Sequence, residues 1–515
     1  MTLAAVHLYR LFSWSRILSK HGVLKPAEKA TIIPASLRFA MRLTRLGSKV
    51  PTPPDYASAF VALGPAAIKF GQTLATRPDL IGEDTANRLS CLQDSVLPVP
   101  FEDIRKVIED SLGCSIETSF RFFNEIPIGS ASIAQVYQAE THEGTTVAVK
   151  VLRPGIKQAF QKATETYEWA ADKIESLNDE FTRLRPKLVV KTFRQWTVRE
   201  LDLRREAASA SELAENMAAE PNFKVPEIDW SRTSQSIMTM QWIDGIKLSD
   251  RQKLIDAGYD LKSLAQCLVH SFLRQAIADG FFHADLHHGN LFVLKDGSLA
   301  VVDFGIMGRI DRKARRWLAE ILYGLITGNY ARIAEIHFEA GYVPQHHSMA
   351  EFTTALRAIG EPIRGLSVSD ISISHMLDGL FAITREFDMP TQPHLLLLQK
   401  TMVVVEGVAT SLHPEINLWD TAEPFVKEWL RAELGPEAHI AEQFHKTMRS
   451  IKRIPELIDR IDQYYPPMTV EDTLYPSSEK IVVKPNLDRY VFSLILIAFI
   501  VGLIIGHYQF FNPHF

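Results

Sequence analysis

Two short runs of the sequence carry residues suited to phosphoryl transfer. His283–Val293 reads H-A-D-L-H-H-G-N-L-F-V, and Val301–Gly305 reads V-V-D-F-G. Phosphoryl transfer depends mainly on positioning and charge neutralisation, so it needs an aspartate at the acceptor and oxygen ligands for magnesium. Asp285 and Asn290 have the D-x-x-x-x-N spacing of a kinase catalytic loop, and Asp303 opens a D-F-G. We predict Asp285 as the catalytic aspartate and Asn290 and Asp303 as Mg²⁺ ligands.

A lysine upstream of these runs can hold the phosphates of ATP. V-A-V-K places Lys150 on a predicted strand, where its ammonium can contact the α- and β-phosphates. Such a lysine needs an acidic partner on a nearby helix, and the run E-L-D-L-R-R-E offers Glu200, Asp202 and Glu206. We predict the catalytic pair Lys150–Glu206.

The phosphates also need a cradle, and no G-x-G-x-x-G is present to form one. The run P-I-G-S-A-S-I-A-Q-V supplies two hydroxyls and a series of backbone N–H groups, which can surround an anion. Besides Lys150, the predicted nucleotide-binding residues are Gly129, Ser130, Ala131, Ser132, Ile133, Ala134, Gln135 and Val136, together with Met240 and Trp242 from a predicted strand.

Three histidines, His283, His287 and His288, surround Asp285 closely enough in sequence to suggest a metal site. His283, however, occupies the position of the structural histidine in a kinase catalytic loop, and we expect it to pack rather than to bind a metal. His287 or His288 could hydrogen-bond a phosphate or the acceptor.

The pattern of apolar and turn residues predicts both strands and helices around these groups. Strand-like runs at 131–139 and 146–152 flank a glycine turn and predict an antiparallel hairpin. A second hairpin, from Leu291–Leu294 and Leu299–Val302, explains how one short loop can bring the predicted catalytic and metal-binding residues together. Helical patterns cover residues 101–112, 156–217, 261–279 and 311–463.

Composition excludes several classes of protein. The chain has 515 residues, 46% hydrophobic and 23% charged, which is ordinary for a globular protein and too long for one core. A net charge of −5 gives no bulk attraction to nucleic acid, and we expect no nucleic-acid partner. Three dispersed cysteines, Cys91, Cys114 and Cys267, indicate neither a zinc site nor a disulfide framework.

The two ends of the chain differ from this average. The first fifty residues carry nine basic residues and one acidic residue, and their start is an amphipathic helical pattern. That helix either lies on an anionic membrane surface or packs on the body of the protein. Tyr490–Gly506 contains no charge, and its continuation to Phe511 gives about 30 Å of helix, enough to cross a bilayer. We predict a transmembrane anchor there, with a buried terminal helix as the alternative. Gly502 and Gly506 would permit close helix–helix association.

Taken together, the motifs resemble those of the UbiB family of atypical kinase-like proteins. Lys69-Phe70-Gly71-Gln72 is similar to the family's K-x-G-Q signature, and P-I-G-S-A-S-I-A-Q-V to its alanine-rich nucleotide loop. V-A-V-K-V-L-R-P-G resembles its strand and turn, and E-L-D-L-R-R-E its E-x-D helix. The resemblance covers about residues 60–340.

The resemblance implies an α+β fold of the protein-kinase-like, two-lobed type, with an N-terminal helical extension and a helical C-terminal region, and the uncharged apolar run adds a C-terminal transmembrane helix. We expect a basic amphipathic region at 1–50, the K-x-G-Q extension at 51–115, an N-lobe with inserted helices at 116–245, a catalytic C-lobe at 246–340, a helical region at 341–485 and the anchor at 486–511.

The resemblance also implies a function. It indicates a membrane-anchored Mg-ATPase that supports ubiquinone biosynthesis, with ATP and Mg²⁺ as cofactors. Its expected partners are membrane lipid, polyprenylated quinone precursors and the enzymes of that pathway, with the catalytic body in the cytoplasm at a bacterial inner membrane. In the family, the extension folds over the catalytic cleft and occludes the place of a protein substrate. The residues implied here are Lys69, Gly71 and Gln72 with Glu200 and Asp202, and Lys69 would pair with Glu200.

Several positions depart from related patterns. Gly129 stands where the family often has alanine, so the preference between ATP and ADP stays open. Ala284 replaces the arginine that reads a phosphorylated activation loop, and no A-P-E follows Gly305, so we expect no peptide-docking platform. Two alternatives remain: a small-molecule or lipid kinase that phosphorylates a quinone precursor, and a nucleotide-sensing pseudokinase scaffold. A hydroxylase is not supported, because the sequence has neither a dinucleotide fingerprint nor a ligand set for oxygen chemistry.

Overall fold

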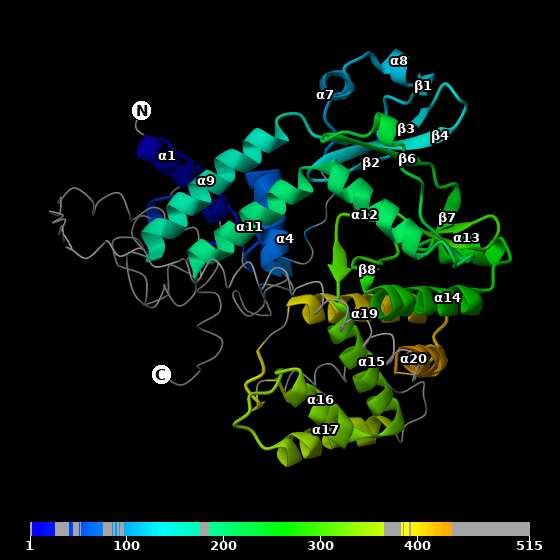
Figure 1. Cartoon of the computed structure of the whole chain (residues 1–515). Coiled ribbons are helices and arrows are strands. Elements are labelled where there is room, and N and C mark those ends of the chain that lie inside the picture. Colours follow the sequence, from blue (N-terminus) through cyan, green and yellow to red (C-terminus); the bar gives the residue numbers. More distant parts are fainter. Residues whose placement is uncertain are drawn as a thin grey trace, which may run out of the picture. The chain divides into compact units, whose positions relative to one another are not determined.

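The computed structural model of the chain describes two compact units (Figure 1). The first contains the described residues up to Ala207 together with Ile228–Trp242, and the second contains Ala208–Glu227 and the described residues from Ile243 onward. The residues that the structure describes are 3–25, 41–44, 51, 53–75, 85, 88–89, 92, 97–175, 185–364, 383–384, 386–390 and 393–434.

The first unit contains an antiparallel five-stranded sheet. The strand order is β1–β3–β4–β6, and β2 pairs with β3. The predicted first hairpin is present as β3 and β4, but β3 begins at Ala134 rather than at residue 131, because residues 131–133 turn between β2 and β3. The strands are β1 (Phe122–Phe123), β2 (Gly129–Ser130), β3 (Ala134–Glu140), β4 (Thr146–Leu152) and β6 (Ile237–Gln241).

Helices cover this sheet and extend beyond it. The predicted helical tract over 156–217 is interrupted, and one break follows α11, where the N–H of Leu203 donates to the carbonyl of Gln235 instead of continuing a helix. The helices are α1 (Leu3–Lys20), α3 (Tyr56–Leu63), α4 (Pro65–Ala75), α7 (Phe101–Leu112), α8 (Ile116–Ser119), α9 (Ile156–Glu175), α11 (Pro186–Glu200) and η2 (Trp230–Arg232), with α12 (Leu203–Asn216) beginning in this unit and ending in the other.

Among the residues that the structure describes, two apolar cores stabilise the first unit. Ile104 and Ile108 of α7 pack against the sheet residues Tyr137 and Val149, and all four side chains are buried. A second, aromatic core joins α4, α9 and α11, and α9 and α11 lie side by side (Figure 1). In it the ring of Phe70 lies 4.9 Å from that of Tyr167 and 5.0 Å from that of Phe193.

The amphipathic N-terminal helix α1 uses its apolar face inside this unit. Leu11 and Leu18 are fully buried, and Trp14 lies 5.4 Å from Tyr167, measured between ring centroids. His7 also hydrogen-bonds Thr166 of α9 at 3.1 Å. Of the two interpretations of this segment, the structure therefore favours a helix packed on the body of the protein.

The second unit contains two small sheets and a set of packed helices. The larger sheet has the order β5–β10–β9–β7, and it includes the predicted second hairpin as β9 and β10. The strands are β5 (Phe223–Lys224), β7 (Gly245–Lys247), β8 (Phe281–His283), β9 (Leu291–Leu294), β10 (Leu299–Val301) and β11 (Met307–Arg309). The helices are α13 (Arg251–Asp256), α14 (Leu261–Leu273), η3 (Arg274–Asp279), α15 (Arg312–Thr327), α16 (Tyr330–Glu339), α17 (Met349–Arg364), α19 (Pro393–Leu412) and α20 (Leu418–Leu434).

The predicted fold class requires one correction. Within the described ranges, no helix is both long enough and apolar enough to cross a bilayer. The C-terminal transmembrane helix of the predicted fold class is therefore not shown. The segment on which it was predicted, 486–511, with Gly502 and Gly506, lies outside the described residues.

Candidate active site

Lys150 and Glu206 form a nearly buried ion pair in the first unit. Lys150 stands on β4 between its register partners Val136 on β3 and Met238 on β6, so its backbone is held from both sides. Its Nζ lies 2.6 Å from Oε1 of Glu206, and the two side chains are 13% and 10% exposed. Glu206 stands in the first turn of α12, where the helix dipole also favours a carboxylate. The ion pair with Glu206 fixes the position of the Lys150 ammonium.

Arg153 holds the predicted nucleotide loop, although the motifs did not single it out as functional. Its guanidinium donates to Ser130 Oγ at 2.8 Å, to the carbonyl of Ala131 at 2.8 Å and to the carbonyl of Leu97 at 3.0 Å. Burial lowers the pKa of the Arg153 guanidinium from its usual value. A signal was available in the sequence, since an arginine directly follows the strand that carries Lys150.

The eight predicted loop residues divide by burial into two groups. Gly129, Ser130, Ala131 and Val136 reach the surface, whereas Ser132, Ile133, Ala134 and Gln135 are buried. The side chain of Gln135 accepts from the N–H of Val99 at 2.9 Å and donates to the Tyr137 hydroxyl at 3.2 Å. Its contacts are thus internal to the unit.

The surroundings of Gly129 and of the two strand candidates, Met240 and Trp242, are as follows. A Cβ added to Gly129 would meet nothing within 4 Å, so alanine fits at this position. Met240 is buried on β6 opposite Ala148 of β4. Trp242 is partly buried, and its N–H donates to the carbonyl of Thr146 at 3.1 Å.

His283 links the two predicted aspartates in the second unit. Its ring is completely buried, and its Nε2 donates to the carbonyl of Asp303 at 2.8 Å, while its Nδ1 accepts from the N–H of Asp285 at 3.2 Å. Burial lowers the pKa of His283, which keeps the imidazole neutral, as these two bonds require. Because main-chain groups occupy both ring nitrogens, His283 positions the loop and is not available to a metal.

Asn290 and Asp303 provide a donor set that fits magnesium. The Asn290 Nδ2 donates to the carbonyl of Asp285 at 3.0 Å, which leaves the amide oxygen as the group that can bind a cation. Asp303 has a φ of +66°, a left-handed conformation that non-glycine residues rarely adopt. An amide oxygen and a carboxylate are the oxygen ligands that Mg²⁺ prefers. Strained backbone of this kind is concentrated at functional sites.

Helix α19 contacts the same loop. Thr401 Oγ1 donates to the carbonyl of Ala284 at 3.3 Å, and the ring of His288 hydrogen-bonds Ser411 Oγ at 2.8 Å. Burial lowers the pKa of His288. His287 is the more exposed of the pair, and its Nε2 lies 3.7 Å from Oδ2 of Asp285. Of the two histidines, His287 is therefore the better placed to meet an acceptor.

The K-x-G-Q residues are embedded in the first unit. Lys69 Nζ lies 2.6 Å from Glu200 Oε1, and Gln72 Nε2 donates to the carbonyl of Leu92 at 3.2 Å. A Cβ added to Gly71 would stand 2.7 Å from side-chain atoms of both Leu92 and Phe60, so a larger residue there would force these side chains to shift. Asp202 instead bonds Arg204, and that hydrogen bond lowers the pKa of Asp202. The structure thus brings Lys69 to Glu200 and not to Asp202.

The strand lysine with its helix glutamate, and the catalytic loop with its D-F-G, together define a kinase-like protein. Models of two domains match this chain: the ABC1 atypical kinase-like domain over residues 91–337 and the UbiB helical domain over residues 356–417. The chain belongs to the UbiB family of atypical kinase-like proteins, which confirms the family predicted from the motifs.

Curated relatives carry the name "Probable protein kinase UbiB". That of Marinobacter nauticus is 39% identical over 403 residues, which cover 78% of this chain and 74% of the relative. That of Aeromonas salmonicida is 40% identical over 408 residues, 78% of this chain and 75% of the relative. That of Aliivibrio salmonicida is 35% identical over 464 residues, 88% of this chain and 85% of the relative.

Proposed function

We propose that this chain is an atypical kinase-like Mg-ATPase of ubiquinone biosynthesis. It would act on hydrophobic quinone precursors, or on the enzymes that modify them, at the cytoplasmic face of a bacterial inner membrane. The observation that carries the proposal is the buried His283, which ties the main chain of Asp285 to that of Asp303. Those are the two aspartates that phosphoryl transfer needs. The relatives named UbiB support the assignment to the quinone pathway.

Each predicted site residue has a separate role in the proposed ATP turnover. Lys150, oriented by Glu206, binds the α- and β-phosphates. Asn290 and Asp303 hold magnesium, whose charge neutralises that of the phosphates. Asp285 orients the attacking hydroxyl or water and accepts its proton.

The chain after Gly305 supports an acceptor other than a peptide. Only the short strand β11 (Met307–Arg309) separates Gly305 from α15, which begins at Arg312. This connection is too short for the activation segment on which protein kinases dock a peptide. We therefore place water first and a small molecule second among the acceptors.

Asp303→Asn is the direct test. Purified wild-type and variant proteins are compared for Mg-dependent release of phosphate from ATP and for thermal stabilisation by Mg-ATP, with and without membranes. Asp303→Asn should lose both, because one metal ligand loses its charge. The matched control is Asp244→Asn, which makes the same substitution at an exposed carboxylate paired with Lys295 and should behave as wild type. Undiminished turnover and Mg-ATP stabilisation in Asp303→Asn would refute the assignment.

A small-molecule kinase is the second candidate, favoured by the short connection after Gly305. Incubation with labelled ATP and a quinone precursor separates the two candidates. Label on the precursor indicates a kinase, whereas label only in free phosphate indicates an ATPase. If Asp285→Asn fully supports quinone synthesis while Lys150→Met does not, the chain is instead a nucleotide-sensing scaffold and turnover is dispensable.

A further inference from the structure

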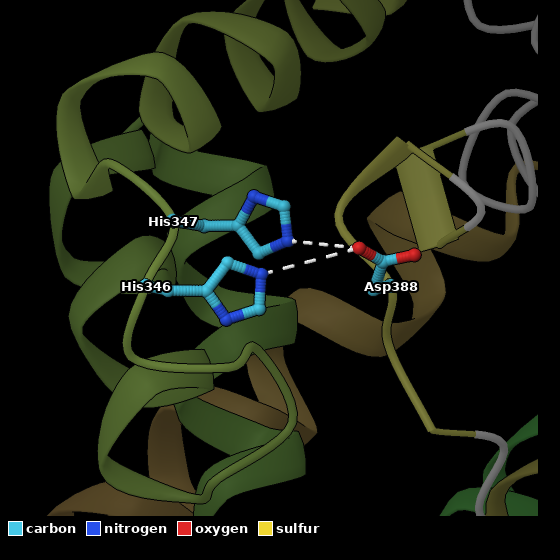
Figure 2. Close-up of side chains that lie close together, drawn as sticks. All are labelled: His346, His347 and Asp388. Carbon is cyan, nitrogen blue, oxygen red and sulfur yellow. Dashed lines mark ion pairs between the residues drawn. The ribbon is translucent and has the colours of Figure 1, made fainter.

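His346, His347 and Asp388 gather in the second unit, in a place to which the proposed function assigns no role (Figure 2). The two histidines follow α16, and the aspartate lies 41 positions after His347 in the chain. Figure 2 shows both imidazole rings turned towards the carboxylate from the opposite side of a short gap. One ligand atom from each residue lies within 4.8 Å of the others.

The spacing of these atoms suits a shared metal ion. Nε2 of His347 lies 3.4 Å from Oδ2 of Asp388, and Nε2 of His346 lies 4.0 Å from the same oxygen. In a tetrahedral zinc site with bonds of about 2.0–2.1 Å, neighbouring ligand atoms stand about 3.3 Å apart. The first distance matches that value, and the second needs only a small side-chain rotation at an exposed histidine.

A direct hydrogen bond does not account for the contact. The Nε2 atom of His347 is buried and has no hydrogen-bond partner among the residues that the structure describes. This nitrogen faces the Asp388 carboxylate oxygen at 3.4 Å without the alignment of a hydrogen bond. If the nitrogen carries no proton, two hydrogen-bond acceptors face each other, and if it carries one, that proton is poorly placed to be donated. A cation between the two atoms would satisfy both of them.

The cluster of His346, His347 and Asp388 packs against an apolar core. The ring of His347 lies 5.3 Å from that of Phe387, and the Phe387 ring lies 5.0 Å from that of Phe352. Phe352 and Phe387 are both buried in a core of nine residues. The backbone on each side of the cluster is therefore held by packing, which limits how much ordering a metal must bring about.

We propose that His346, His347 and Asp388 bind Zn²⁺, with a fourth position open to water or to an exogenous ligand. Two imidazoles and one carboxylate suit zinc, whereas Mg²⁺ prefers a set made of oxygen ligands alone. The ion cross-links the loop after α16 to the segment 386–390. This site is separate from the proposed Mg-ATP residues, so the proposal stands or falls independently of the ATPase function.

The test uses the full chain without a polyhistidine tag, stripped of metal with a chelator. Zn²⁺ is titrated in competition with a chromophoric zinc indicator, and Co²⁺ absorption reports the coordination geometry. The wild type should bind one Zn²⁺ at this site and give the Co²⁺ spectrum of a tetrahedral site. His346→Ala and Asp388→Asn should each weaken Zn²⁺ binding at least tenfold. Removing a residue that only hydrogen-bonds a metal ligand already weakens metal binding by about tenfold or more, and removing the ligand itself should cost no less.

These two variants separate binding from folding. The side chains of His346 and Asp388 are 68% and 73% exposed, so their removal should leave the thermal midpoint of the metal-free protein unchanged. His142→Ala, at an exposed histidine of the first unit, is the matched control and should bind as wild type. Wild-type affinity in both His346→Ala and Asp388→Asn would overturn the proposal. Loss of binding in His287→Ala alone would also overturn it, because the ion would then belong to the catalytic loop.

Discussion

The ion pair Lys150–Glu206 offers a prediction whose magnitude follows from the structure. Glu206→Gln keeps the shape of the side chain and removes its charge, which leaves the Lys150 ammonium 13% exposed beside a neutral amide. Removing one partner of a fully buried pair costs about 3–5 kcal/mol, and a hydrogen bond to a charged group contributes about 1.5–3 kcal/mol. The amide oxygen can still accept from Lys150 Nζ and some solvent reaches the pair, so we expect a loss of about 2 kcal/mol.

The assay is a double-mutant cycle on the free energy of unfolding in urea. It compares the wild type, Glu206→Gln, Lys150→Met and the double variant. The double variant lacks both members of the pair, and residues in direct contact couple, so it should be more stable than the sum of the single losses predicts, with a coupling of about 1 kcal/mol or more. The control is the exposed pair Arg194–Glu168, which has a similar 2.9 Å contact and side chains 55% and 37% exposed. Glu168→Gln should change stability by about 0.5 kcal/mol or less.

Two outcomes would contradict this reasoning. A coupling no larger than that of the exposed control pair would mean that burial does not strengthen the Lys150–Glu206 contact. Wild-type ATP turnover in Glu206→Gln would mean that Lys150 reaches the phosphates without its glutamate, and the orienting role of Glu206 would be refuted.

Four further predictions concern single sites. Lys69→Ala removes the ion pair with Glu200 and should raise autophosphorylation, and flat incorporation of labelled phosphate would argue against an occluding role. Arg153→Lys replaces three guanidinium nitrogens, each of which donates to a different acceptor, with a single ammonium nitrogen. The KM for ATP should therefore rise about tenfold with a smaller change in kcat. An unchanged KM would show that the loop is held without Arg153. Gly129→Ala should leave the thermal midpoint unchanged, since a Cβ there meets nothing within 4 Å, and the ratio of ATP to ADP affinity in this variant tests whether the glycine sets nucleotide preference. Burial holds the pKa of His283 below its ordinary value of 6.5, so the unfolded chain binds the extra proton first as the pH falls. Stability should therefore be greatest above pH 6.5 and fall as the pH is lowered from there, and a thermal midpoint that does not fall between pH 7 and 5.5 would contradict it.

Much of the local structure was predictable from the sequence. The hairpins β3–β4 and β9–β10 combine apolar alternation with glycine turns, and both signals lie within a few residues of each other. The sequence predicted that residues 156–217 are helical, but it did not predict where the helices end and begin again. The break before α12 depends on the bond from the Leu203 N–H to the Gln235 carbonyl, and no local pattern reports a partner 32 positions away.

The candidate site also has features that the sequence predicts and features that only the structure shows. Glu200, Asp202 and Glu206 lie in one short run of sequence, E-L-D-L-R-R-E, and composition alone does not rank them as partners of the lysines. The structure distributes them among Lys69, Arg204 and Lys150 respectively, because each acid meets the cation that folding brings within hydrogen-bond distance. Arg153 was missed for the opposite reason: its partners are mostly backbone carbonyls, which no motif records.

By itself, the sequence determined which chemistry is available to this chain. The spacing of Asp285, Asn290 and Asp303 indicated phosphoryl transfer, because these residue types lie in kinase-like order within one short stretch of sequence. The strand lysine Lys150 added a group that can bind phosphates. Only the tertiary structure decided that His283 is a neutral link between the aspartates, and that Asp388 meets the histidine pair. Burial and hydrogen-bond distance determine these roles, and both are properties of groups that approach each other only when the chain has folded.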